Sequence, residues 1–424
     1  MTVVGAGVND GYLGPEDIHR VCRDGLAPLP VDGRRVLVII PDGTRTMPMP
    51  EMFERLTQEL APRTSALDFL VALGTHTPMD DAALGRLIGR PVVDGRAGAH
   101  RLFNHRWDDP GSFIDLGSID SSVIADLTGG RFRQNVRVAL NRLATEYDHV
   151  IICGPVFPHE VAGFSGGTKY LFPGIAAPDI IHFTHWLGAV ITSSEVIGTA
   201  ETPVRRVIDR AAAMLDTPLS LMALVVMHDG IAGLFVGDVH EAWRRAAALS
   251  ARRHIIWVDR PFDRVLSVMP PMYDDLWTAA KGAYKTETAV RDGGEVIVFA
   301  PHVDEVSRVH GSLIEAIGYH CRDYFIEQWD RFGHYPGGIL AHSTHVKGLG
   351  RYEAATGRET PRITVTLATG IARERCAHIN LGYRDPATIN PLEWPADLDS
   401  AEVVVPRAGE FLFRVGRPPA PPVS

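Results

Sequence analysis

Apolar runs of strand length alternate with amphipathic stretches of helix length over most of the chain. RRVLVIIPD (34–42) and ALDFLVALGTH (66–76) are apolar runs that end in polar residues, and EMFERLTQELAPR (51–63) between them has helical periodicity. A third run, DHVIICGPV (148–156), follows the same pattern. Continuous apolar strands joined by helices are typical of a parallel sheet covered on both faces. The alternation therefore predicts an α/β fold.

The length of 424 residues predicts two domains, because one hydrophobic core rarely serves more than about 250–300 residues. A second strand–helix–strand series begins with FDRVLSVMPP (262–271). We expect an N-terminal α/β domain over 1–258, a C-terminal α/β domain over 259–405 and a C-terminal segment over 406–424, with the active site in the cleft between the domains. The strand predicted in that last segment, GEFLFRV, could return to either domain.

Charge and cysteine usage exclude several classes of protein. The net charge of −9 argues against a nucleic-acid partner, since such proteins usually carry a basic surplus. The four cysteines show no CxxC spacing, which indicates reduced thiols in a cytoplasmic protein and no cysteine zinc site. No apolar run reaches the roughly 18 residues of a membrane helix, so we expect no membrane partner. The N-terminus lacks the features of a secretory signal.

The segment HEVAGFSGGTKYLFPGIAAPDIIHFTH (159–185) concentrates chemically active residues. It begins with His159, Lys169 closes a glycine-rich turn, and His185 ends it, 16 residues after the lysine. A P-loop would need glycine before the lysine and Ser or Thr after it, but Thr168 and Tyr170 stand there. The turn can still offer N–H groups and hydroxyls to a phosphate. The residues that permit this are Gly163, Ser165, Gly166, Gly167 and Thr168.

Three polar residues follow directly after predicted strands. They are Asp42, His76 and His159. Because ligands gather at the carboxyl ends of strands in open parallel sheets, we expect these side chains to share one site. Arg45, three residues after Asp42, could clamp a substrate carboxylate, with Asp42 orienting it. The alternative is that Asp42 caps a turn and that Arg45 is a surface residue.

The remaining histidines and aromatic residues can each be explained by a purely structural role. His105 and His182 are plausible decoys, although His182 and His185 have the spacing of two metal ligands on one helix turn. His342 and His345 have the same spacing and likewise lack a clustered third ligand. Lys281 would lie over Trp277 on one face of a predicted helix, and Trp329 is by default a core aromatic.

Taken together, these segments resemble the lactate racemase family, the nickel-pincer-nucleotide enzymes, from about Val36 to Lys347. The family's Asp-His-Thr-Arg-Pro segment appears as DGTRTMP, and its Gly-Phe-His-Arg-Pro segment appears as GTHTPM. Its AGFSGG-x-K block, the most specific of these motifs, appears as HEVAGFSGGTKYLFPGIA. The Asn-His segment appears as FTHWLG, the AxKG helix as TAAKG and the Asp-Gln-Trp segment as EQW.

The resemblance implies a role for each matching residue. Lys169 would hold the cofactor, a pyridinium-3-thioamide-5-thiocarboxylic acid mononucleotide with nickel, through a thioamide, and His185 would be the protein's nickel ligand. His76 and His159 would act as general base and acid on opposite faces of the substrate. Arg45, beside Asp42, would hold the substrate carboxylate. Lys281 and Trp329 would close the site from the second domain, and the cofactor-synthesis enzymes would be partners.

The implied activity is that of an isomerase, a racemase or epimerase acting on a small 2-hydroxy acid. Removing hydride from the α-carbon gives a stable 2-keto acid, whereas removing a proton would leave an enediolate beside an anion. Trp277 and Thr278 stand where lactate racemase has a tyrosine and a glutamine, and Thr168 replaces an arginine. We therefore expect malate or another substituted 2-hydroxy acid as substrate, with lactate as the alternative. A zinc-dependent hydrolase and a non-catalytic nucleotide carrier are the rival classes.

Overall fold

The computed structural model describes residues 2–228 and 230–418, and the chain divides into two compact units. The first consists of Met1–Phe157, Ala162–Thr184 and Ala200–Arg253, and the second of Pro158–Val161, His185–Thr199 and His254–Ser424. The expected domains were contiguous in sequence, whereas these units are not. Two short segments from the first half of the chain therefore belong to the second unit. The last six residues of the expected C-terminal segment, 419–424, lie outside the described residues.

The first unit is built on an eight-stranded sheet with the order β1-β12-β11-β8-β2-β3-β5-β4. Strands β11, β8, β2, β3 and β5 run parallel, and β12, β1 and β4 are antiparallel to their neighbours. The bounds are β1 (Val4–Gly7), β2 (Arg35–Ile40), β3 (Ala66–Val71), β4 (Arg96–Ala97), β5 (His100–Asn104), β8 (His149–Pro155), β11 (Leu219–Met227) and β12 (Gly230–Gly237). The three runs predicted as buried strands are confirmed as β2, β3 and β8.

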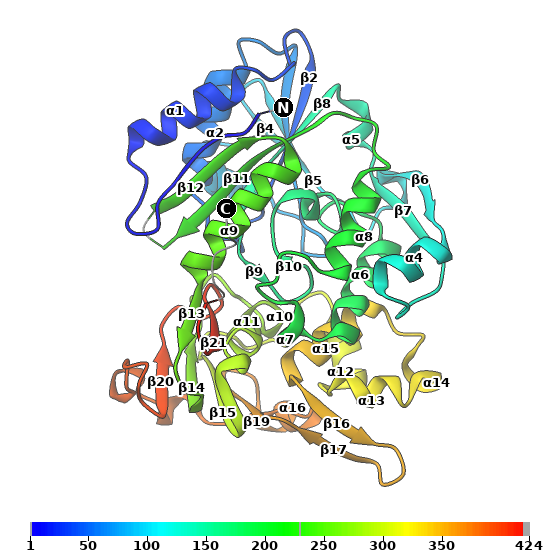
Figure 1. Ribbon diagram of the computed structural model, residues 1–424, viewed down its shortest axis with the longest axis vertical. Helices are drawn as coiled ribbons and strands as arrows, with labels where there is room; N and C mark the ends of the chain where they lie inside the picture. Colours follow the sequence, from blue (N-terminus) through cyan, green and yellow to red (C-terminus); the bar gives the residue numbers. More distant parts are fainter. Residues whose placement is uncertain (1, 229, 419–424) are drawn as a thin grey trace. The chain divides into compact units, whose positions relative to one another are not determined.

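Helices α1 and α2 lie side by side on one face of this sheet (Figure 1). Their apolar residues join those of β2 and β3 in one hydrophobic core, so the helix predicted over 51–63 is confirmed. The helices of the unit are α1 (Pro15–Leu26), α2 (Met49–Leu60), α3 (Asp81–Ile88), α4 (Ser121–Thr128), α5 (Leu143–Glu146), α8 (Pro203–Ala212) and α9 (Val239–His254). A separate antiparallel pair is formed by β6 (Phe113–Ile119) and β7 (Val136–Asn141), and short 3-10 turns are η1 (Pro110–Ser112) and η2 (Gly167–Tyr170).

The segment that follows β8 supplies residues to both units. Its elements are β9 (Pro158–His159), β10 (Gly163–Phe164), α6 (Pro178–Ile191) and α7 (Ser193–Val196). Helix α6 begins among residues of the first unit and ends among residues of the second. The Phe172–Pro173 peptide bond before it is cis.

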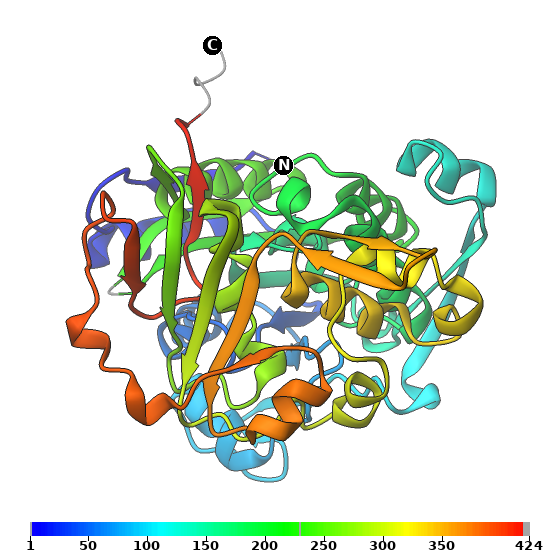
Figure 2. The same cartoon turned by 90° about the horizontal axis from the view of Figure 1, so that it is seen from below.

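The second unit contains a five-stranded parallel sheet with the order β19-β18-β15-β14-β20, drawn in green to red in Figure 2. Its strands are β14 (Phe262–Val268), β15 (Val290–Ala300), β18 (Thr364–Thr369), β19 (Gly382–Tyr383) and β20 (Glu402–Val405). Two further pairs are β13 (Ile255–Val258) with β21 (Leu412–Val415) and β16 (Gly350–Glu353) with β17 (Arg358–Pro361). The last predicted strand thus returns to the second unit, as β21. Each unit is α/β, which confirms the expected fold class.

The helices of the second unit are short. They are α10 (Leu276–Ala279), α11 (Lys281–Tyr284), α12 (Gly311–Ile317), α13 (Arg322–Ile326), α14 (Trp329–Phe332), α15 (Gly337–Lys347) and α16 (Arg373–His378), with 3-10 turns η3 (Glu287–Ala289), η4 (Pro386–Thr388) and η5 (Pro391–Glu393). The helix predicted around Lys281 is therefore two single turns. Across the described residues, no helix has the length and apolar character needed to cross a membrane.

Candidate active site

Asp42 and His76 meet at the carboxyl ends of neighbouring parallel strands, β2 and β3. The Oδ2 atom of Asp42 lies 2.5 Å from Nδ1 of His76. Its Oδ1 atom accepts hydrogen bonds from the backbone N–H and the hydroxyl of Thr44, at 3.1 and 2.7 Å. The indole N–H of Trp107 donates to the His76 carbonyl at 3.2 Å and fixes that backbone. The shared strand-end position therefore produces a histidine–carboxylate pair.

The carboxyl of Asp42 is buried and stays ionised. Burial by itself raises its pKa, but His76, Arg45 and the Thr44 hydrogen bonds together hold the pKa well below its usual range. The sequence suggested that Asp42 orients Arg45. In the structure the two carboxylate oxygens are engaged by Thr44 and His76, so Asp42 orients the imidazole through its Nδ1, and the charge of Arg45 also acts on Asp42.

The glycines of the turn before Lys169 are required by the packing of the chain. Gly166 and Gly167 have φ values of 79° and 60°, in the left-handed region. A Cβ on Gly166 would lie 2.6 Å from Val156, and one on Gly167 would lie 2.9 Å from the ring of Trp243. The turn is thus held tightly against the interior of the first unit.

Two residues that sequence reasoning missed hold this turn in place. Arg205 is 1% exposed; it donates to the carbonyls of Phe164 and Gly166 and its guanidinium lies 4.2 Å above the Trp243 ring. The indole N–H of Trp243 donates to the Ser165 carbonyl at 2.9 Å. Burial lowers the pKa of Arg205 to about 10. The available signal was an arginine within the apolar stripe of α8, a position where a charged residue is rarely buried without a partner.

The hydroxyls of the turn are occupied by the protein itself. Ser165 Oγ accepts from the Phe157 N–H at 2.8 Å and donates to the Pro155 carbonyl at 3.1 Å. Thr168 Oγ1 donates to Asp209 at 2.5 Å. The sequence assigned both hydroxyls to cofactor binding. These hydrogen bonds hold the turn in place, because buried polar groups must be satisfied where they lie, and the assignment to cofactor binding stays a prediction.

Lys169 differs from its neighbours in exposure. Every other residue from 161 to 173 is buried, whereas Lys169 is half-buried. Burial raises the pKa of the adjacent Tyr170 hydroxyl, which Arg45 opposes and Asp42 reinforces. The end of the glycine turn therefore lies within electrostatic reach of the Asp42–His76 pair, in the same unit.

His159 belongs to the second unit and also has a carboxylate beside its ring. Its Nδ1 accepts a hydrogen bond from the Val161 N–H at 3.1 Å and lies 3.4 Å from Oε2 of Glu160. The ring is buried, with 11% of its side chain exposed. Glu160 is a third residue that sequence reasoning missed, although it stands directly after His159.

His185 lies half-buried on α6, near a group of histidines and aromatic rings. Burial lowers the pKa of His342 well below its ordinary value, and the neighbouring imidazoles of His345, His310 and His185 lower it further. The ring of His342 stacks on Trp277 with centroids 3.9 Å apart and contacts the Tyr319 hydroxyl at 3.3 Å. His342 is therefore a stacked core residue.

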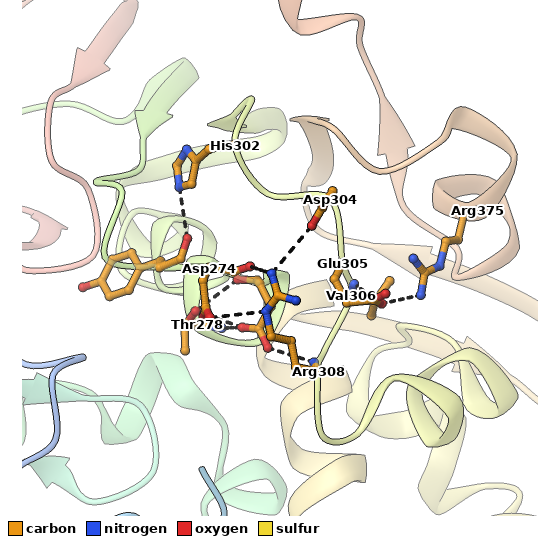
Figure 3. Close-up of polar contacts among 10 residues, drawn as sticks. Asp274, Thr278, His302, Asp304, Glu305, Val306, Arg308 and Arg375 are labelled. Carbon is orange, nitrogen blue, oxygen red and sulfur yellow. Dashed lines mark hydrogen bonds and ion pairs between the residues drawn. The ribbon is translucent and has the colours of Figure 1, made fainter. Parts of the chain in front are cut away.

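The expected substrate-facing residues of α10 and α11 are fixed by the second unit's own contacts. Asp275 caps α10: its Oδ1 accepts hydrogen bonds from the Thr278 N–H at 3.0 Å and from the Thr278 hydroxyl at 2.9 Å. Arg308 braces the same helix end through Asp274, as Figure 3 shows. Lys281 places its ammonium 4.3 Å from the centroid of the Tyr273 ring. The Thr278 hydroxyl is thus engaged by the capping Asp275, while Trp277 and Lys281 are half-buried.

Trp329 is not a core aromatic. It is 45% exposed and stacks on Trp186 with ring centroids 5.5 Å apart. His105, expected to be a decoy, is buried between the Ala176 carbonyl and the Asn141 amide, and burial lowers its pKa to about 4. Among residues 2–228 and 230–418, the side chains form no group of three or more His, Cys, Asp or Glu that could hold a metal ion by themselves.

Fold and site together define an α/β protein that carries a histidine–carboxylate pair at the ends of parallel strands, with a lysine closing a glycine turn nearby. The family model "Lactate racemase N-terminal domain" matches residues 19–198. This part of the chain is therefore similar to the N-terminal domain of lactate racemases.

Individual relatives agree with that placement. The lactate racemase of Thermoanaerobacterium thermosaccharolyticum is 23% identical over 276 residues, 64% of this chain and 61% of that protein. The lactate racemase of Lactiplantibacillus plantarum is 26% identical over 303 residues, 65% of this chain and 62% of that protein. The matched region thus spans about three-fifths of each relative's length.

Two solved structures resemble the chain over nearly its whole length. The crystal structure of a Thermotoga maritima protein has a TM-score of 0.86 and 27% identity, covering 96% of this chain and 100% of that chain. The lactate racemase apoprotein of Thermoanaerobacterium thermosaccharolyticum has a TM-score of 0.71 and 18% identity, covering 93% and 92%. At that identity, the second likeness concerns the fold alone.

Proposed function

We propose that this protein is a racemase or epimerase that inverts the α-carbon of a 2-hydroxy carboxylic acid with a nickel-pincer nucleotide. The observation that carries the proposal is the Asp42–His76 pair at the strand ends, in a chain that matches the lactate racemase N-terminal domain and also contains His159. Inversion through a planar ketone needs an acid–base group for each face of the substrate. A carrier of the nucleotide would need neither histidine.

Each residue proposed to hold the cofactor fits its part. Lys169 is half-buried, whereas the other residues of the turn are buried. An amine must be accessible in this way to react with a bound group. His185 offers a half-buried imidazole, a usual ligand for nickel and other transition metals. When bound, the cofactor supplies reversible hydride acceptance, which turns the substrate alcohol into a ketone and back.

The chain's own residues bind the substrate and move its hydroxyl proton. Arg45 would take the carboxylate with its planar guanidinium. Nε2 of His76 would exchange the hydroxyl proton, because Asp42 occupies Nδ1 and stabilises the imidazolium. His159 would serve the opposite face; to exchange a proton at Nε2 its ring must carry the other proton on Nδ1, directed at Glu160 in place of the bond from the Val161 N–H.

For the substrate, we propose malate or another substituted 2-hydroxy acid, with lactate as the alternative. Trp277 supports this choice, because a half-buried indole stands where lactate racemase has a tyrosine. Thr278 gives no such support, since its hydroxyl is bonded within the cap of α10.

The test is racemisation by protein produced together with the cofactor-synthesis enzymes. We expect inversion of at least one member of a panel of chiral 2-hydroxy acids, nickel in the purified protein and an organic adduct on Lys169 by peptide mass spectrometry. Zinc without an adduct would favour a hydrolase. An unmodified Lys169 in active protein would contradict the cofactor assignment.

A further inference from the structure

Tyr170, the residue directly after Lys169, has a hydroxyl without a partner in the protein. The residue is 9% exposed, and no group in the described part of the chain forms a hydrogen bond with this hydroxyl. The oxygen is not fully enclosed either, in contrast to the unpartnered Nδ1 of His149. Burial raises the pKa of the phenol, so the hydroxyl stays protonated and can donate. Because buried tyrosine hydroxyls usually have a partner, this one is suited to a bound ligand.

The Tyr170 ring lies over Gly154, near the carboxyl end of β8. A Cβ on Gly154 would lie 2.0 Å from the Tyr170 hydroxyl oxygen and 2.3 Å from the ring carbon that bears it, so only glycine leaves room for the ring. Strand β8 is the parallel neighbour of β2, the strand that Asp42 follows. The hydroxyl is therefore held at the edge of the sheet where ligands gather in α/β proteins.

Backbone hydrogen bonds join the turn that carries Tyr170 to the loop that carries His76. The N–H of Gly174 donates to the Lys169 carbonyl at 3.1 Å, and the carbonyl of Gly174 accepts from the N–H of Gly74 at 2.9 Å. Gly74 stands between β3 and His76, and all of these residues belong to the first unit. A Cβ on Gly174 would lie 2.4 Å from the Tyr170 carbonyl oxygen, so the turn is closed tightly. Tyr170 is thus fixed relative to the histidine–carboxylate pair.

The charges that act on the Tyr170 hydroxyl favour an anionic ligand. The positive charge of Arg45 acts on it more strongly than the negative charge of Asp42 does. The Asp42 carboxylate is moreover engaged by Thr44 and His76. A neutral O–H donor together with a guanidinium matches a carboxylate, whose two oxygens accept several hydrogen bonds at once.

We propose that the Tyr170 hydroxyl donates a hydrogen bond to the carboxylate of the bound 2-hydroxy acid, alongside the guanidinium of Arg45. The guanidinium supplies the charge, and the phenol supplies one more directed bond, which limits rotation of the carboxylate and so orients the α-carbon. The inference rests on the proposed function, because that function names the acid. The carboxylate is the same in the 2-hydroxy acid and in the 2-keto acid, so both should use this bond.

The first test measures the stability of the apoprotein. Tyr170→Phe removes the hydroxyl and keeps the ring over Gly154. Because that hydroxyl bonds nothing in the protein, the variant should unfold at the same urea concentration as the unmodified protein or at a higher one. Tyr147→Phe is the matched control: Tyr147 is also buried, but its hydroxyl donates to Asp68 at 2.6 Å, so its loss should lower the unfolding midpoint. A fall in Tyr170→Phe as large as that in Tyr147→Phe would overturn the inference, since the hydroxyl would then serve the fold.

The second test measures ligand binding and kinetics. Calorimetric titration of the apoprotein with lactate, malate and the matching 2-keto acids should give a Kd that Tyr170→Phe raises by about tenfold or more. Tyr352→Phe, which changes a half-buried tyrosine of β16 in the second unit, should leave Kd unaltered. In loaded protein, Tyr170→Phe should raise KM by a similar factor and change kcat less than twofold, because the bond is equally strong in the ground state and the transition state.

The outcomes separate this inference from the proposed function. Equal Kd and KM in Tyr170→Phe and in the unmodified protein would overturn the carboxylate contact, even where racemisation is observed. A fall in kcat with an unaltered KM would also overturn it, because the hydroxyl would then act on the reacting carbon. A protein that binds the acids more weakly after Tyr170→Phe but inverts none of them would refute the proposed function and support the contact.

Discussion

At the scale of single residues, the most informative contact is the 2.5 Å pair between Asp42 and His76. Asp42→Asn keeps the shape of the side chain but removes the charge that holds the imidazole. We expect kcat/KM for racemisation to fall by about 10²–10⁴, with thermal unfolding showing that the protein is still folded. Asp68→Asn is the matched control: Asp68 is equally buried but pairs with Tyr147 and Arg101, so activity should persist. A loss below threefold in Asp42→Asn would remove Asp42 from the mechanism.

The second prediction for a single residue concerns Arg45. Lysine would keep the positive charge but lose the planar fork that matches a carboxylate. Arg45→Lys should therefore raise KM for the 2-hydroxy acid by about tenfold, or roughly 1.4 kcal/mol of binding energy. Arg63→Lys serves as control, since Arg63 bonds Asp32 and the carbonyls of Leu26 and Leu29. Initial rates over a range of substrate concentrations decide the matter, and an unaltered KM would argue that another group binds the carboxylate.

At the scale of elements, the glycine turn before Lys169 is predicted to tolerate no side chain. Gly166→Ala combines a left-handed φ of 79° with a Cβ 2.6 Å from Val156. Gly11→Ala has a similar φ of 68° with no atom within 4 Å, so it measures the backbone strain alone. We expect about 1 kcal/mol of destabilisation for Gly11→Ala and a further 1–3 kcal/mol or so for Gly166→Ala. Urea unfolding of the two variants as apoproteins measures the difference in their free energies of unfolding. Equal destabilisation in both would show that the Val156 side chain moves aside at little cost.

The elements themselves differ in how far sequence predicts them. Strands β2, β3 and β8 follow from continuous apolar runs, because a strand buried on both faces needs no other signal. The helix expected around Lys281 is instead two single turns. A Cβ on Gly282 would lie 3.0 Å from Ser267 of β14 and 2.5 Å from Met269, which follows that strand, and the Ser267 hydroxyl donates to the Gly282 carbonyl. Local periodicity cannot report such a contact with another strand.

At the scale of the whole molecule, buried neutral histidines make stability depend on pH. Burial lowers the pKa of His105, His149 and His345 to about 4, below the ordinary value of 6.5. Between these values the unfolded chain binds more protons than the folded one, so the free energy of unfolding is greatest above pH 6.5. It should fall as the pH drops from 6.5 towards 4, by on the order of 1–3 kcal/mol for each histidine.

Urea unfolding of the apoprotein at pH 7.5 and pH 5 measures this dependence. His105→Gln should weaken it, because the glutamine amide can bond within the core without taking up a proton. His378→Gln changes an exposed histidine and should leave the dependence as it was. A free energy of unfolding that is equal at both pH values would show that these histidines are not held neutral.

Sequence alone predicted the α/β class and the buried strands β2, β3 and β8, because periodicity is a local property. It also predicted that Asp42 and His76 each follow the end of a strand. Tertiary structure decided which groups touch. Asp42 orients His76, Arg205 and Trp243 hold the glycine turn, and Glu160 lies against His159 and acts on His345. Most of these partners are far apart in the chain, and only folding brings them within reach of a hydrogen bond or a charge.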